Sequence, residues 1–189
     1  ALQKVTRIWA SFHFLPFDLN AEPNRKTTRK YKNKYRLICK PNGRLVKDTV
    51  LLAKKEKTLQ AVGVAMHIVA DTWAHAYFCG TPSLIINDTN HSVTEIREVG
   101  GEKTEKRIVF RHVPGSEDDV ENYVYSNSMY RSSENSIMNL GHGRMGHLPD
   151  YSYITYRYMP AWGDYATLLK ENPKDYYHAF CPLVYAMKF

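Results

Sequence analysis

The pattern of apolar and polar positions is dominated by one stretch, AVGVAMHIVADTWAHAYFC, from Ala61 to Cys79. Apolar residues occur on every side of a helix drawn through it, which is typical of a helix buried in a protein core. Because helical patterning begins further upstream, we predict one long helix or two shorter ones between Asp48 and Phe78. Gly80-Thr81-Pro82 is expected to end this region.

The same stretch approaches the length of a membrane span. It carries Asp71 and two histidines near its centre, however, and three lysines precede it closely. Ionisable side chains are costly in the hydrocarbon region of a bilayer. We therefore predict a core helix and no transmembrane segment.

The remaining pattern predicts further helices and one hairpin. Two segments of alternating polar and β-branched residues, Ser92 to Val99 and Lys106 to Val113, flank Gly100-Gly101 and predict a β-hairpin. The helices are expected at residues 27–39, 120–140 and 164–170. The predicted fold class is mainly α: a single domain over residues 1–189, built as a helical bundle with a metal-binding central helix and a small β-hairpin insertion at 92–113.

Three metal-capable side chains are spaced four residues apart in the apolar stretch: His67, Asp71 and His75. In an α-helix each such step turns about 40° past one revolution and climbs about 6 Å, so all three project from one stripe. A buried carboxylate needs a partner. Hydrogen bonds within an ordinary core would satisfy it, but the regular spacing favours metal binding.

The stripe is too long for one ion. The Cα atoms of His67 and His75 are expected about 12 Å apart, whereas zinc–nitrogen bonds measure about 2.1 Å. Asp71 lies between them and could serve one ion while facing a second about 3.5–4 Å away. The stripe therefore suits a multi-metal cluster.

Two other segments carry candidate ligands. His13 lies in the aromatic segment SFHFLPF, and GHGRMGHLPDY, from Gly141 to Tyr151, places His142 and His147 among glycines and before Asp150. Each segment is weak evidence alone, because core and loop histidines are common, and Arg144 between the two histidines is interpreted as a surface residue rather than a phosphate contact. Combined with the stripe, the candidate metal ligands are His13, His67, Asp71, His75, His142, His147 and Asp150. His91, His112 and His178 have no partners at ligand spacing.

Charge and cysteine content add two expectations. The net charge is +7, and residues 25–57 hold 13 Lys and Arg against Asp48 and Glu56. This basic segment could face nucleic acid or an anionic membrane surface, although a solvated helix face is the usual explanation of such a segment. Three widely spaced cysteines predict no disulfide framework and favour the cytoplasm, and no signal peptide is visible at the start.

The order of these motifs resembles the zinc-dependent phospholipase C and single-strand nuclease superfamily, and more closely a bacterial branch of it that shares HIVADTWAHAYFCG and GHGRMGHLPD. The resemblance implies an α-helical domain with three zinc ions. It assigns His13, His67 and Asp71 to one ion and His75 with His142 to a second, with His147 or Asp150 in the position of an acidic ligand.

Two departures from that superfamily matter. Its enzymes space the last helix histidine six residues after the Asp, whereas here the spacing is four. The family's terminal amine, early His and first Asp would lie before Ala1 or have no counterpart. The resemblance therefore implies either a preceding segment or a cluster reduced to one or two ions.

These observations predict a metal-dependent hydrolase, with zinc as the expected ion, acting on a phosphoester such as a phospholipid head group or nucleic acid. Two alternatives remain from the residues themselves. One is a non-catalytic, metal-stabilised protein with a closed site. The other is an anionic-ligand binding module that uses residues 25–57. The sequence leaves the substrate and the oligomeric state open.

Overall fold

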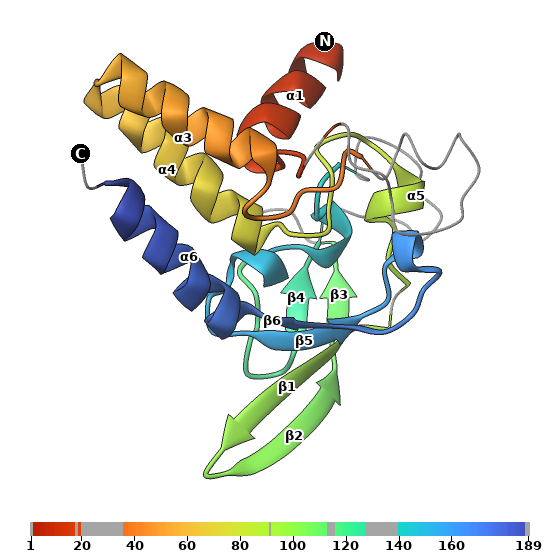
Figure 1. Ribbon diagram of the computed structural model, residues 1–189. Helices are drawn as coiled ribbons and strands as arrows, with labels where there is room; N and C mark the ends of the chain where they lie inside the picture. The colour runs from red at the N-terminus through yellow and green to blue at the C-terminus, as the bar shows by residue number, and fades with distance from the viewer. Residues whose placement is uncertain are drawn as a thin grey trace. The chain divides into compact units, whose positions relative to one another are not determined.

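The computed structural model describes residues 2–17, 19, 36–90, 92–112, 116–127 and 140–187. The chain forms two compact units (Figure 1). Unit 1 comprises Ala1–Thr81 and Asp175–Phe189, and unit 2 comprises Pro82–Lys174.

Unit 1 is helical. It contains α1 (Leu2–Ile8), the π-helix η1 (Trp9–His13), α3 (Arg44–Glu56) and α4 (Leu59–Ala74). The helix α6 (Asn172–Ala186) joins it from Asp175 onwards and runs alongside α3 and α4 (Figure 1). The core of this unit includes Phe14, Ile68, Val69 and Phe78, all at most 5% exposed.

The region predicted as one or two helices is two, and the break between α3 and α4 has a local cause. Lys57 adopts a left-handed conformation (φ 54°), and its backbone N–H donates to the Ala53 carbonyl, which closes α3. The hydroxyl of Thr58 then accepts from the backbone N–H of Ala61 and caps α4. α4 ends at Ala74 rather than Phe78, with His75 as its C-cap.

Unit 2 is built on an antiparallel sheet with strand order β2-β1-β5-β6. Its strands are β1 (Thr94–Val99), β2 (Glu102–Arg107), β5 (Thr155–Tyr158) and β6 (Leu168–Glu171). A second, parallel pair consists of β3 (Val109–Arg111) and β4 (Val124–Ser126). Short helices complete the unit: α5 (Leu84–Asn87), η3 (Gly143–Met145), η4 (Leu148–Asp150) and η5 (Ala161–Gly163).

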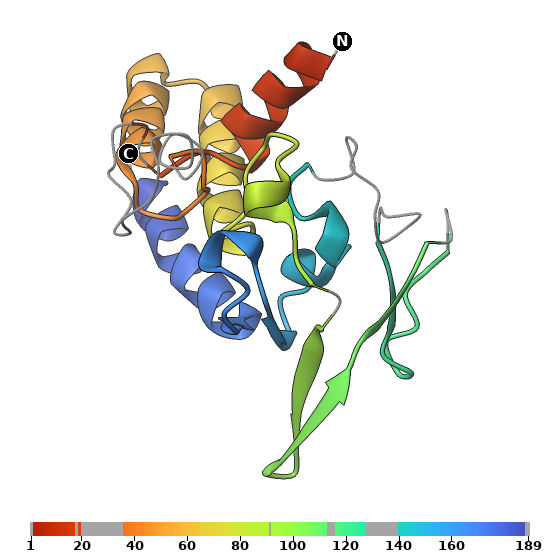
Figure 2. The same cartoon turned by 90° about the vertical axis from the view of Figure 1, so that its right-hand side faces the viewer.

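The β1–β2 hairpin projects beyond the rest of this sheet (Figure 2). β1 pairs with β5 only through Thr94 to Ile96, whereas it pairs with β2 along its full length. The ring of Tyr123 supports the projecting part, with the Arg97 guanidinium 3.7 Å and the Lys106 ammonium 4.6 Å from its centroid. Arg97 also donates to the buried carboxylate of Glu95.

The prediction of a mainly α helical bundle is wrong, because the protein is mixed α/β. The hairpin predicted at 92–113 forms between β1 and β2, but it is half of a four-stranded sheet rather than an insertion into a bundle. β4 and β6 lie where helices were expected at 120–140 and 164–170. These two strands have only three and four residues, which is too short for local periodicity to mark them.

Other expectations fall outside or at the edge of the described residues. Most of the helix expected at 27–39 lies outside them, and residues 36–39 are turn and bridge rather than helix. Residues 128–139 of the other expected helix also lie outside them. Within the described part of the chain, no helix has the length and apolar character to cross a bilayer. Its three cysteines, Cys39, Cys79 and Cys181, are free thiols.

Candidate metal centre

The π-helical segment η1 places His13. The backbone N–H of Phe14 donates to the carbonyl of Trp9 over 2.8 Å, an i to i+5 bond that inserts one extra residue per turn. Phe14 is fully buried, and its ring stacks 4.8 Å from that of His75. Gly80 lets this segment approach closely, since a Cβ there would lie 2.5 Å from the backbone nitrogen of Ala10. Phe14 and Gly80 together fix where His13 points.

The carboxylate of Asp71 is the centre of the candidate site. Its Oδ2 lies 2.9 Å from Nδ1 of His13 and 3.2 Å from Nε2 of His67. The two imidazole nitrogens are themselves 3.3 Å apart, and their rings meet edge to face. The structure therefore brings together three predicted ligands from two segments that are 54 or more residues apart in sequence.

These three distances match the spacing of ligand atoms around one ion. Two ligand atoms on a tetrahedral zinc with bonds of about 2.0–2.1 Å lie about 3.3 Å apart. An ion about 1 Å above the plane of the three atoms would be about 2 Å from each of them. The donor set of His13, His67 and Asp71 thus fits a zinc ion in both type and spacing.

His75 has a different position from the other members of the stripe. Its Nδ1 donates to the backbone carbonyl of His13 over 2.7 Å and lies 3.7 Å from Oδ2 of Asp71. His75 is buried, and it ties the end of α4 to η1. The equal spacing in sequence therefore does not give three equivalent ligands.

The site is open on one side. The side chain of His67 is 49% exposed and that of His13 is 35% exposed, whereas Asp71 is 15% exposed. Asp71 also borders a cavity of about 290 Å³ between α4 and α6, which is otherwise lined by Ala70, Trp73, Ala74, Tyr176, Ala179, Phe180 and Leu183. An ion held by three protein ligands here would keep a coordination position toward solvent.

The remaining predicted ligands lie in unit 2, around η3 and η4. Nδ1 of His142 donates to the Gly146 carbonyl over 2.7 Å, and its Nε2 lies 3.7 Å from Oδ1 of Asp150. Nδ1 of the exposed His147 lies 3.4 Å from Oδ2 of Asp150. Asp150 is therefore flanked by both histidines of the motif. The expectation that these residues share a cavity or an ion with the unit 1 residues stays a prediction.

One residue that holds this loop was not identified from the sequence. The side-chain amide of Asn172 donates to the carbonyls of Leu148 and Tyr151, at 2.7 and 2.8 Å, and so fixes the turn that carries Asp150. Asn172 lies beyond a strand that sequence periodicity did not reveal, which left no signal for this contact.

Arg144 was expected at the surface, and that expectation is wrong. It is 5% exposed, and its Nη1 donates to Oδ1 of Asp88 over 2.8 Å. Oδ2 of Asp88 accepts from the Tyr165 hydroxyl, a bond that together with burial raises the pKa of Tyr165 to about 12. The ion pair anchors the glycine-rich loop to α5, so Arg144 has a structural role.

The structure describes two of the three histidines that have no partners at ligand spacing in the sequence. His178 is exposed and stacks against Trp73, and Nδ1 of His112 donates to the Asn127 carbonyl. His91 lies outside the described residues. In the basic segment, residues 25–35 also lie outside them, while the lysines of α3 are exposed or half-buried.

The fold and the site define a mixed α/β protein with a candidate metal centre on a half-buried helix, rather than the fully buried one that the sequence predicted. The chain belongs to a family of unknown function, DUF6765, whose profile matches residues 1–189. No curated protein and no solved structure matches it.

Proposed function

We propose that unit 1 binds a zinc ion through His13, His67 and Asp71 and that the protein is a metal-dependent hydrolase of phosphoesters. The observation that carries the proposal is the triangle of ligand atoms, with edges of 2.9, 3.2 and 3.3 Å, on a partly exposed face.

Hydrogen bonding alone accounts for this triangle less well. Nδ1 of His13 contacts both Asp71 and His67, but an imidazole nitrogen carries either one hydrogen or one lone pair. Oδ2 of Asp71 could accept a hydrogen from both rings, but the edge between the two nitrogens, at 3.3 Å, would then gain no hydrogen bond. A cation accepts a lone pair from all three atoms at once, and the Asp71 carboxylate offsets part of its charge.

The ligand types support zinc and a catalytic rather than a closed site. Two imidazoles and a carboxylate suit zinc, and three protein ligands with an open position are typical of its catalytic sites. A bound zinc ion supplies Lewis-acid activation of water and of a phosphoester oxygen. Around it, His75 orients the His13 backbone, and the cavity bordered by Asp71 offers an apolar flank for a substrate. The resemblance of the motifs to zinc-dependent phospholipases C and nucleases favours a phosphodiester.

Metal analysis and a diesterase assay on the same preparations test the proposal. We expect purified protein to contain zinc and to hydrolyse bis-p-nitrophenyl phosphate, and chelation to remove both the metal and the activity. His178→Ala is the matched control, since it removes an exposed histidine of unit 1 that is not a ligand in this proposal. Bound metal without hydrolysis would favour the metal-stabilised alternative. Metal content that is independent of His13, His67 and Asp71 would return these residues to ordinary core packing.

A further inference from the structure

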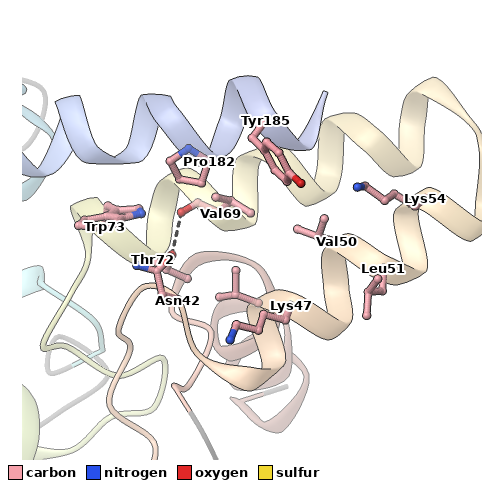
Figure 3. A pocket seen from close by; sticks show the side chains of 11 residues that line it. Asn42, Lys47, Val50, Leu51, Lys54, Val69, Thr72, Trp73, Pro182 and Tyr185 are labelled. Carbon is pink, nitrogen blue, oxygen red and sulfur yellow. Dashed lines mark hydrogen bonds between the residues drawn. The ribbon is translucent and has the colours of Figure 1, made fainter. Parts of the chain in front are cut away.

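A second cavity of unit 1, of about 370 Å³, lies between α3, α4 and α6 (Figure 3). This volume falls within the range of small-molecule sites. Its walls are mostly apolar and come from all three helices. The lining residues are Asn42, Val46, Lys47, Val50, Leu51, Lys54, Val69, Thr72, Trp73, Pro182 and Tyr185.

The wall is mostly apolar, although Asn42, Trp73 and Tyr185 each bring a polar group to its lining. The Thr72 hydroxyl points into its own helix and donates to the Val69 carbonyl over 2.7 Å, as the dashed line in Figure 3 shows. Pro182 presents a ring and has no backbone N–H to offer. Val50 and Val69 face the same space from opposite helices (Figure 3). An alkyl chain suits such a surface better than a polar ligand.

The charged groups at this cavity are of one sign. Lys47 and Lys54 lie two helical turns apart on α3, about 10 Å along its axis, and both line the cavity. Among the described lining residues there is no carboxylate. The nearby Asp48 is not a lining residue and pairs with Arg44 on the same helix. The cavity thus combines an apolar wall with uncompensated positive charge.

Lys54 is the better placed of the two lysines. It is half-buried, whereas Lys47 is exposed, and its ammonium group lies 5.9 Å from the centroid of the Tyr185 ring. Partial burial weakens solvent screening and strengthens an ion pair.

We propose that this cavity binds the alkyl chain of a fatty-acid carboxylate, with Lys54 pairing with the carboxylate. Lys47 adds a weaker, longer-range attraction. The proposal does not rest on the metal centre, because none of His13, His67 and Asp71 lines this cavity.

Calorimetric titration with dodecanoate below its micellar concentration tests the proposal, with dodecyltrimethylammonium as the probe of equal chain length and opposite charge. We expect saturable binding of dodecanoate and at least tenfold weaker binding of the cation. Lys54→Gln should weaken dodecanoate binding about fivefold and Lys47→Gln about twofold. Lys55→Gln, which neutralises the adjacent exposed lysine outside the cavity, should change it little.

Val50→Trp should abolish binding, because the larger ring fills the cavity, and circular dichroism should confirm that this variant is folded. Protein stripped of metal should bind dodecanoate as tightly as metal-loaded protein, which separates this inference from the proposed function. Equal binding of the two detergents, or binding that survives Val50→Trp, would overturn the proposal. The absence of dodecanoate binding would also overturn it, and a dimer in sedimentation would then indicate that a second copy covers the cavity.

Discussion

The His75 imidazole donates from Nδ1 to the backbone carbonyl of His13 over 2.7 Å. This bond joins the end of α4 to the π-helical segment that presents His13, and it fixes the tautomer of the His75 ring. His75, which the sequence spacing predicts as a ligand, thus also holds the backbone of His13, a second predicted ligand.

Removing a ligand from the triangle should remove the metal. We expect His67→Ala and Asp71→Ala each to weaken zinc binding at least about 100-fold, measured by competition with a chromophoric chelator. Asp71→Asn should be nearly as damaging as Asp71→Ala, because the amide keeps the shape of the side chain but not its charge. Zinc affinity that is retained in Asp71→Asn would mean that the carboxylate is not a ligand.

The role of His75 can be separated from ligation at this ion. His75→Phe preserves the stacking on Phe14 but removes the donor to the His13 carbonyl, which should cost about 1–3 kcal/mol of unfolding free energy and about tenfold in zinc affinity. His75→Asn keeps a donor near the position of Nδ1 and should recover part of both losses. Urea denaturation and the chelator competition provide the two measurements. If the two variants behaved alike, the bond to His13 would have no energetic role.

Two glycines of unit 1, Gly80 and Gly63, provide a test and a control for the close contact between Gly80 and η1. Gly80→Ala places a Cβ 2.5 Å from the Ala10 backbone, so we expect a loss of about 1–3 kcal/mol in stability and weaker zinc binding, because η1 must shift. Gly63→Ala lies in α4 with open space around the new Cβ and should stabilise the protein by about 0.5–1 kcal/mol. Thermal unfolding compares the two, and the reverse order would contradict the described packing.

The buried Tyr125–Glu95 pair should make stability depend on alkaline pH. Burial, with the hydrogen bond to Glu95, raises the pKa of Tyr125 above its usual value of 10. Because the folded state keeps this proton longer than the unfolded state, the stabilisation is complete below about pH 10 and is lost as the pH rises above it. Denaturant titrations from pH 8 to 11 should show this decline, and Tyr125→Phe should make it shallower while costing about 1.5–3 kcal/mol at pH 7. An unchanged slope in Tyr125→Phe would assign the decline to other groups.

The helical spacing of His67 and Asp71 was readable from the sequence because it depends only on the local geometry of α4. The hairpin at Gly100-Gly101 was readable for a similar reason, since its turn and alternation are local. The strands β4 and β6 were not, because each is too short to show a periodic pattern and is defined only by its pairing with another strand. The α6 helix was obscured by Pro173 and Pro182, although the first lies in its opening turn, where proline is tolerated.

In the candidate site, too, features set by local sequence were predictable and features set by tertiary contacts were not. The convergence of His13 on Asp71 was expected from the motifs, but the π-helical turn that achieves it leaves no periodic signal. The distinct position of His75 follows from where α4 ends, and helix ends are the least predictable part of a helix. The buried pairing of Arg144 with Asp88 depends on a tertiary contact that no spacing reveals.

The division of unit 1 into two stretches of sequence sets an order of events at the ribosome. The part of α6 that belongs to unit 1 begins at Asp175, so it is synthesised only after residues 82–174 have been added. At translation rates of about 5–20 residues per second that delay lasts about 5–20 seconds. During this interval Val69 and Trp73 are without Pro182 and Tyr185, which line the same cavity in the folded protein. Until α6 is added, the nascent chain therefore exposes this apolar side of α4, a surface of the kind that chaperones bind.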